Sequence, residues 1–377
     1  IAVRLHHCGY PILMTEIEAP LTVRRMVAFS RAVYEGEAVV EGITGVRVQT
    51  PEEIRKVQQQ GKIPVLVDPH AAIRTVYQPD VLIDAILAKK NLGTEVTDAP
   101  FVIGVGPGFT AGEDCHCVIE TKRGHTLGSV IFRGTAIPNT GIPGDVGGYT
   151  IERLLKSTAA GVMEPVAAIG DLVQKGEIVA YTGGEPVYAK MTGIVRGMLQ
   201  RGVVVEKDLK IGDIDARCEV SHCFTISDKA RAIGGGVLEA VVQFERICRK
   251  YAVIVLAAGN ASRFGSNKLL VDVQGKPLYR HMLDKLAGLG AFPRILVTGY
   301  EEIAEAAEAI GVCTVANHQS ELGISHSLKL GLEKCKSIEP DVKGVLFCVC
   351  DQPGLSLATM MGLMRLAINR PGMILVS

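Results

Sequence analysis

The fold of the last third of the chain is decided by Tyr251-Ala-Val-Ile-Val-Leu-Ala-Ala-Gly-Asn-Ala-Ser-Arg-Phe-Gly-Ser-Asn-Lys268. The apolar run Tyr251–Ala258 predicts a buried strand. A loop of mostly small residues, Gly259–Gly265, follows it. Such a loop can fold around a triphosphate with its backbone N–H groups facing the phosphates, while Arg263 and Lys268 supply positive charge. The stretch therefore predicts a triphosphate-binding loop at the end of a strand in an α/β domain.

This loop differs from a Walker A loop, because its two glycines are six residues apart and Lys268 is not followed by Ser or Thr. The residues expected to contact the triphosphate are those of the strand end and the loop, within Leu256–Lys268: Leu256, Ala257, Ala258, Gly259, Ser262, Arg263, Gly265 and Lys268.

A second strand of the same domain ends in an acid, in Phe347-Cys-Val-Cys-Asp-Gln-Pro353. Open α/β sheets bind ligands at the carboxyl ends of their strands. Mg²⁺ favours one or two carboxylates together with phosphate oxygens. Asp351 is therefore a candidate Mg²⁺ ligand and, with Arg263 and Lys268, a candidate catalytic residue. The alternative is that Asp351 caps the helix expected after Pro353.

The first 160 residues alternate strands with helices, which predicts a mainly parallel sheet. Thr50 as a cap and Pro51 in the first turn mark the start of one helix. The expected helices are Ile1–His7, Val23–Tyr34, Pro51–Gln60 and Tyr149–Lys156, and the expected strands are Tyr10–Ile17, Gly45–Val48, Ile63–Val67, Val81–Ile83 and Phe101–Val105.

Two features of this part are candidates for cofactor binding. Glu16 is expected at the end of a strand, where an acid hydrogen-bonds a ribose in Rossmann units. Gly106, Gly108 and Gly112 follow an apolar strand and could let backbone N–H groups approach a phosphate. The alternatives are a solvated carboxylate and a plain tight turn. The glycine loop that normally precedes such an acid would lie before Ile1, so the chain is expected to be part of a longer protein.

Residues 161–217 consist of short strands and turns, and the segment contains two similar strand–turn–strand phrases. This internal repeat predicts a small β sandwich that resembles the biotinyl/lipoyl hammerhead type. Ala189-Lys-Met191 resembles half of a biotin attachment site. However, carriers hold their lysine at the tip of the hairpin that joins the two halves, and Lys190 precedes a strand instead. We therefore interpret Lys190 as a structural surface residue. A helix–turn–helix over Ile226–Phe244, broken at Gly234–Gly236, and a charged link at Glu245–Lys250 are expected next.

The composition excludes several classes of function. Forty basic residues balance forty acidic ones, which argues against nucleic-acid or membrane-surface binding. The apolar run Ala252–Ala258 is far shorter than the roughly 20 residues that cross a bilayer. Ten scattered cysteines are typical of a reduced cytoplasmic protein. The pairs Cys115/Cys117 and Cys348/Cys350 lack a second pair at zinc-ligand spacing, which favours buried thiols over a metal site.

The motifs of the last part resemble the MobA-like nucleotidyltransferase superfamily, in its molybdenum cofactor cytidylyltransferase branch. The resemblance covers Tyr251–Ser377 and rests on Ala257-Ala-Gly259 and on Asp351-Gln-Pro353. Asn317-His318 and Gly323-Ile-Ser-His-Ser327 match the middle signature of the superfamily, which adds Asn317 and Ser325 to the nucleotide-binding set. A second metal-binding Asp of the superfamily would lie beyond Ser377, so the chain is expected to bind CTP without completing turnover.

The first 245 residues resemble a second family, the YqeB-type accessory proteins of selenium-dependent molybdenum hydroxylases. The matching phrases are Val81–Thr94, Gly106–Gly112, Ile119–Gly128, Pro138–Gly144 and Ile211–Arg217. That family normally opens with an Arg-Gly-x-Gly-Asp loop, whose absence agrees with a chain that starts inside a longer unit. The resemblance implies a maturation pathway but no particular reaction.

Together these observations predict a Rossmann-like parallel-sheet domain over 1–160, a hammerhead-like β insert over 161–217, a helical return over 218–250 and a Rossmann-like nucleotidyltransferase domain over 251–377. The resemblances imply Mg²⁺-dependent transfer from CTP to a molybdenum pterin, with a molybdenum hydroxylase apo-enzyme as partner. Two alternatives stay open: the same chemistry with another nucleotide or phosphate acceptor, and a non-catalytic scaffold that delivers the cofactor.

Overall fold

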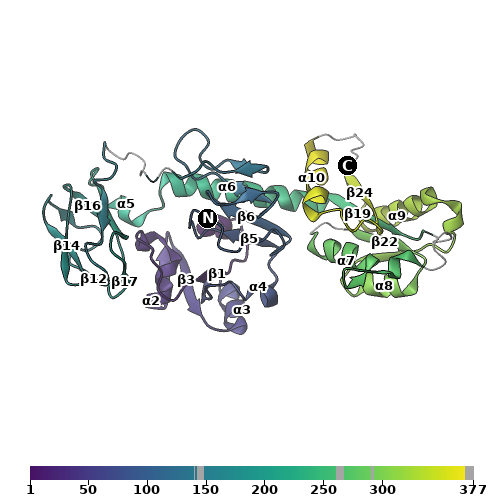
Figure 1. The fold of residues 1–377 in the computed structure, drawn as a ribbon, viewed down its shortest axis with the longest axis horizontal. Coiled ribbons are helices and arrows are strands. Elements are labelled where there is room, and N and C mark those ends of the chain that lie inside the picture. The colour runs from purple at the N-terminus through teal and green to yellow at the C-terminus, as the bar shows by residue number, and fades with distance from the viewer. Residues whose placement is uncertain (140, 142–147, 260–266, 290–292, 370–377) are drawn as a thin grey trace.

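The computed structural model describes residues 1–139, 141, 148–259, 267–289 and 293–369. Three lobes lie in a row along the long axis of the molecule (Figure 1). The β-sandwich lobe is at one end, a lobe built from the first 138 residues lies in the middle, and the lobe that starts at Tyr251 is at the other end. The long helix α6 (Asp228–Lys250) joins the middle lobe to the C-terminal one.

The middle lobe contains two small sheets. The first has the order β1-β4-β3-β2, in which β1, β4 and β3 are parallel and β2 is antiparallel to β3. The second has the order β5-β6-β8-β9, in which only the β8–β9 pair is antiparallel. Their strands are β1 (Met14–Glu16), β2 (Glu37–Val40), β3 (Ile43–Val48), β4 (Ile63–Val67), β5 (Val81–Asp84), β6 (Phe101–Val105), β8 (Cys117–Ile119) and β9 (Val130–Ile131).

Helices α1 (Ala2–His7) and α3 (Pro51–Gln59) confirm two of the helices expected here. The Thr50 side chain accepts a hydrogen bond from the Glu53 N–H at the start of α3, as the capping pattern predicts. The smaller elements are α4 (Arg74–Tyr77), β7 (Thr110–Ala111) and β10 (Gly134–Thr135).

The helix expected over Val23–Tyr34 is wrong. The segment forms the short 3-10 turns η1 (Arg25–Val27) and η2 (Phe29–Arg31) and a single turn α2 (Ala32–Glu35). The backbone explains the break, because the Val23 carbonyl accepts a hydrogen bond from the Met198 N–H of the β sandwich. Ala28 is extended between the two turns, so the segment follows the neighbouring lobe instead of closing a helix.

The β sandwich consists of two four-stranded antiparallel sheets, with orders β11-β18-β16-β13 and β15-β14-β12-β17. It buries a core of its own, which includes Leu155, Met163 and Ile214. The helix expected over Tyr149–Lys156 is wrong, because Arg153, Leu155 and Ser157 are buried in alternation, which is the period of a strand. The strands are β11 (Leu154–Lys156), β12 (Gly161–Pro165), β13 (Leu172–Val173), β14 (Ile178–Thr182), β15 (Glu185–Tyr188), β16 (Gly193–Met198), β17 (Val204–Val205) and β18 (Lys210–Asp215).

The stretch from the sandwich to the C-terminal lobe is a short turn, α5 (Ser221–Phe224), followed by α6. The expected helix–turn–helix with a charged link is wrong, since α6 runs unbroken through the glycine trio Gly234–Gly236 to Lys250. A Cβ on Gly236 would lie 2.0 Å from the carbonyl oxygen of Gly128. That glycine therefore permits close packing of the helix on a neighbouring loop and does not mark a turn.

The C-terminal lobe is built on a sheet with the order β23-β22-β19-β24, and every pair in it is parallel. Ala252 and Ile254 of β19 face α9, whereas Val253 and Val255 face α7, α10 and the end of α6. The elements are β19 (Tyr251–Ala257), η3 (Lys268–Leu270), β20 (Asp272–Val273), β21 (Lys276–Pro277), α7 (Leu278–Gly288), β22 (Arg294–Thr298), α8 (Glu301–Glu308), β23 (Cys313–Ala316), η4 (Ser320–Leu322), α9 (Ile324–Ile338), β24 (Gly344–Val349) and α10 (Leu357–Asn369).

The expected α/β fold class is therefore confirmed, with parallel sheets in the middle and C-terminal lobes. None of the helices within the described ranges is both long enough and apolar enough to cross a membrane.

Candidate functional site

The candidate site lies at the carboxyl edge of the C-terminal sheet. Numbered along the chain, the four strands have the order 3-2-1-4, so the direction of the connections reverses between β19 and β24. Ligands of open α/β sheets bind at such a switch point, beside the carboxyl ends of the strands. Gly259 follows β19 and Asp351 follows β24, so the chain places both at this point.

Lys268 and Asp351 meet at the switch point. The Lys268 ammonium donates to the Asp351 carboxylate, and the two side chains are 39% and 35% exposed. Leu269, the next residue in η3, is buried and anchors this turn in the core. The Cys350 N–H donates to the Leu256 carbonyl over 3.0 Å. This hydrogen bond ties the residue before Asp351 to β19. A cation and a carboxylate, both reachable by solvent, therefore lie side by side at the switch point.

Two residues at and just beyond the end of β22 bind the chain where it leaves β19, and the sequence interpretation missed both. The Thr298 hydroxyl donates to the Ala257 carbonyl over 3.2 Å. The Tyr300 hydroxyl donates to the Gly259 carbonyl over 3.3 Å. Both bonds hold the chain where it leaves β19. The missed signal was the position of Thr298 and Tyr300 at the end of a parallel strand, which brings them to the same edge.

Asn317 lies just beyond β23, at the same edge, and is 2% exposed. Its Nδ2 donates to the Ser327 hydroxyl over 2.8 Å, and its Oδ1 accepts from the Gln319 N–H over 3.0 Å. These bonds fasten the loop after β23 to α9. Ser325 is exposed in the first turn of α9.

Leu256, Ala257 and Ala258 are at or just beyond the end of β19, and Ala257 and Ala258 are buried. Three other residues of the expected loop, Ser262, Arg263 and Gly265, lie outside the described residues.

The candidates in the middle lobe are not brought to one place by any described contact. Burial raises the pKa of Glu16, and a hydrogen bond from the Ile17 N–H opposes that rise. A Cβ on Gly108 would lie 2.5 Å from the Lys90 backbone, and one on Gly106 would lie 3.0 Å from the Thr121 hydroxyl. Neighbouring protein atoms therefore fill the space beside Gly106 and Gly108 that a side chain would otherwise take.

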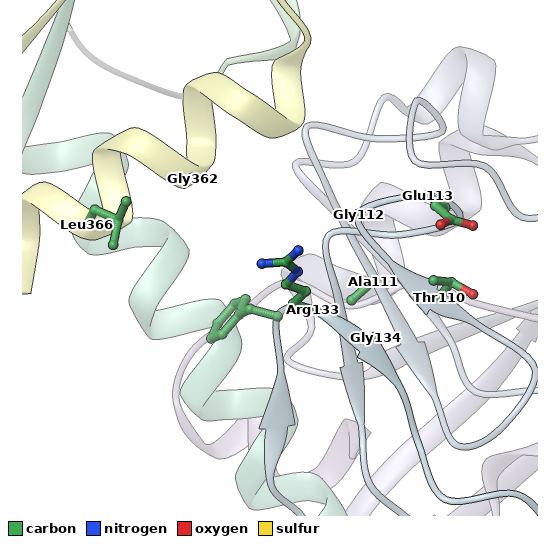
Figure 2. Close-up of a pocket in the computed structure, with 9 residues that line it drawn as sticks. Thr110, Ala111, Gly112, Glu113, Arg133, Gly134, Gly362 and Leu366 are labelled. Carbon is green, nitrogen blue, oxygen red and sulfur yellow. The ribbon is translucent and has the colours of Figure 1, made fainter. Parts of the chain in front are cut away.

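Gly112 lies elsewhere, in the lining of a cavity of about 710 Å³ between the middle lobe and α10. Residues 110–113 and 132–134 form one side, and Gly362 and Leu366 of α10 form the other. Arg133 extends from the middle lobe toward α10 (Figure 2). The cavity is open to solvent, and the charged side chains in its lining are Arg133 and Glu113.

The cysteine pairs and Lys190 carry no site in the structure. Cys115, Cys117, Cys348 and Cys350 are buried, and burial raises the pKa of Cys115 and Cys350 to about 12. Within the described ranges no cluster of His, Cys, Asp and Glu could hold a metal ion with three or more protein ligands. Gly183 and Gly184 form the tip of the β14–β15 hairpin, and Lys190 lies beyond it, just before β16.

The parallel sheet and its strand order fit a nucleotidyltransferase domain, and a family comparison supplies that class. Residues 253–377 match the MobA-like NTP transferase domain. The chain is also 48% identical over 242 residues to the protein YqeB of Escherichia coli K12. That match covers 64% of this chain and 45% of YqeB, so the chain spans less than half the length of this relative. The resemblance of the C-terminal part to the MobA-like superfamily and that of the first 245 residues to YqeB are confirmed.

Two further similarities cover smaller parts of the chain. The bifunctional protein GlmU of Desulfotalea psychrophila is 32% identical over 108 residues, which are 28% of this chain and 31% of GlmU. The crystal structure of Rv0371c from Mycobacterium tuberculosis H37Rv aligns with 27% identity and a TM-score of 0.27, over 32% of this chain and 60% of that one.

Proposed function

We propose that the C-terminal domain transfers a cytidylyl group from CTP to the phosphate of a molybdenum pterin, and that the protein serves the maturation of molybdenum hydroxylases, including selenium-dependent ones. The observation that carries the proposal is the meeting of Lys268 and Asp351 at the switch point of a parallel sheet. The match to the MobA-like domain and the phrases Ala257-Ala-Gly259 and Asp351-Gln-Pro353 support the choice of chemistry.

In this reaction an oxygen of the pterin phosphate attacks the α-phosphorus of CTP. A new P–O bond forms, the bond from the α-phosphorus to the bridging oxygen breaks, and pyrophosphate leaves. Such transfers depend on positioning and on neutralising the negative charge that develops. Lys268 would hold the triphosphate at the strand ends. Gly259, fixed by Tyr300, would let the loop backbone approach it.

The residues present suit one Mg²⁺ ion that the protein and the nucleotide hold together. Asp351 supplies one carboxylate at the sheet edge, and Mg²⁺ commonly binds one or two carboxylates plus phosphate oxygens. Bound there, Mg²⁺ would neutralise charge on the reacting phosphates. Asp351 would have to release Lys268 to bind the metal, which would also free the ammonium for the triphosphate.

The test is a pyrophosphate-release assay with the full-length protein, Mg²⁺ and molybdopterin or its molybdenum form. The four nucleoside triphosphates are compared at equal concentration. We expect release with CTP and much less with GTP. Release with GTP alone would favour the same chemistry on another nucleotide. No release with any nucleotide, but measurable binding of CTP, would favour a cofactor-delivery scaffold.

A further inference from the structure

Several cationic side chains gather where the segment before η1, the β sandwich and α5 meet, far along the chain from the nucleotide site. The junction is well packed, since a Cβ on Gly197 of β16 would lie 2.8 Å from the Val23 carbonyl. The charged side chains of the junction are the cations Arg24, Arg153, Arg196, Lys210 and Arg217 and the carboxylates Asp213 and Asp215.

The carboxylates are already used by part of this set. Arg153 binds both oxygens of Asp213, at 3.1 and 3.0 Å. Arg217 binds both oxygens of Asp215, at 2.9 and 2.6 Å. Asp215 also faces Arg196, but at 3.5 Å. A third carboxylate, Asp228, also acts on Arg196 and Arg217 but is paired with Arg123. The cluster therefore keeps an excess of positive charge next to buried groups.

Two of the guanidinium groups keep a buried N–H without an acceptor among the described residues. Arg196 is 7% exposed, and its Nε has no hydrogen-bond partner there. Arg24 donates through Nη2 to the carbonyls of His222 and Thr225, at 2.9 and 3.3 Å, yet its Nε is also unpaired and buried. The Nδ1 atom of His222 is a third unpaired, buried nitrogen. Buried polar groups in native proteins normally have a partner, which can be a bound ion.

Contacts with α5 bring these groups together, because Arg24 binds carbonyls on either side of Cys223. The Cys223 thiol lies 3.7 Å from the carbonyl of Val195, next to Arg196. Burial, together with repulsion from Arg196, lowers the pKa of Arg24 to about 10. Burial raises the pKa of the Cys223 thiol, and the positive charges of Arg24 and Arg196 oppose that rise. Both guanidinium groups therefore act on the same buried thiol. An anion beside them would relieve their mutual repulsion.

We propose that this junction binds a tetrahedral oxyanion, either free or as the phosphate group of a larger molecule, between Arg24 and Arg196. Guanidinium N–H groups match the oxygens of phosphate in geometry and charge. The Arg217 side chain is 42% exposed, so the cluster reaches the surface on that side and offers a way in. The site is separate from the proposed transferase chemistry, and a failure of either leaves the other intact.

The test is equilibrium binding of inorganic phosphate to the full chain by calorimetry, with chloride at equal ionic strength as the reference. We expect saturable phosphate binding, and Arg24→Gln and Arg196→Gln should each weaken it at least tenfold. Arg201→Gln is the matched control, because Arg201 is an exposed arginine of the same sandwich whose Nη2 donates to the Pro165 carbonyl. It should change the affinity less than twofold.

The variant Lys268→Ala separates this site from the nucleotide site, and the phosphate binding that depends on Arg24 should persist in it. Loss of binding in that variant, equal losses in Arg201→Gln and Arg24→Gln, or no saturable binding at all would overturn the proposal. If circular dichroism shows that Arg196→Gln does not fold, the Arg24→Gln variant alone tests the proposal, because the Arg24 side chain is only half-buried. Ribose 5-phosphate shows which kind of ligand the site takes. If it binds and the binding depends on Arg24, the ligand is a phosphate monoester. If only inorganic phosphate binds, the ligand is a free oxyanion.

Discussion

Lys268 and Asp351 form an ion pair across the carboxyl edge of the C-terminal sheet, although 83 positions separate them in the chain. Lys268 comes from the turn after the phosphate loop, and Asp351 comes from the end of β24. Each is more than a third exposed, so solvent screens the pair and its net contribution to folding is small. Either residue can therefore exchange its partner for a ligand at little cost.

Replacing either residue should impair the transfer reaction with little effect on stability. We expect Lys268→Ala and Asp351→Ala each to lower turnover at least tenfold, about 1.4 kcal/mol of barrier. The measurement is steady-state pyrophosphate release by the full-length protein. Lys329→Ala is the control, because Lys329 is an exposed lysine of the same domain on α9. Wild-type turnover in either site variant would remove that residue from the site.

Lys268 should also weaken metal binding in the absence of nucleotide, because it competes for the Asp351 carboxylate. Removing the competing charge with Lys268→Met should tighten Mn²⁺ binding about twofold to fivefold, which is the range of an exposed ion pair. Electron paramagnetic resonance of free Mn²⁺ measures this directly. Lys276→Met is the control, since Lys276 pairs with Asp284 instead. Weaker Mn²⁺ binding in Lys268→Met would contradict the competition.

Gly236 should tolerate no side chain, because a Cβ there would lie 2.0 Å from the Gly128 carbonyl oxygen. We expect Gly236→Ala to lower the free energy of unfolding by about 1–3 kcal/mol, as overpacking does. Gly235→Ala, in the same helix, meets only the end of the Arg4 side chain at 3.4 Å. That variant should be neutral or more stable, since Ala suits a helix interior better than Gly. Equal denaturation midpoints for the two variants would refute the packing argument.

Asp215 should stabilise the fold above about pH 4. Burial raises its pKa, but the hydrogen bonds and positive charges of Arg217 and Arg196 outweigh burial and hold it at about 2. A carboxylate with a lowered pKa in the folded state stabilises it by an amount that is fully present above its unfolded pKa of about 3.9 and is lost as the pH falls through 2. The stability difference between wild type and Asp215→Asn, from urea titrations, should therefore shrink by about 2 kcal/mol between pH 4 and pH 2. A difference that is constant with pH would contradict this role.

The sequence predicts the C-terminal fold well because its signals are local. The apolar run Tyr251–Ala258 becomes β19, and Thr50 with Pro51 starts α3 as the capping pattern requires. The positions of Lys268 and Asp351 also follow from local signals, since each comes directly after a predictable strand or loop. Their direct contact depends on the strand order, which no single segment encodes.

The errors arise where tertiary contacts override local preference. Gly234–Gly236 is a turn signal in isolation, but in α6 it is the surface on which α1 and a loop pack closely. Residues 153–157 contain good helix formers, yet the sandwich core takes up Leu155 and selects a strand. The cluster around Arg196 was invisible for the same reason, because its members come from residues 24 to 217 and share no motif.

Helix α6 contributes Val237, Val241 and Phe244 to a hydrophobic core that also contains Phe101 of the middle lobe and Tyr251 and Val253 of the C-terminal sheet. The Phe101 and Phe244 rings stack 4.8 Å apart. If either α/β lobe unfolds, the other loses packing contacts in the shared core. On heating, the two lobes should therefore denature in a single calorimetric transition. The β sandwich, with a separate core, is free to denature at a temperature of its own.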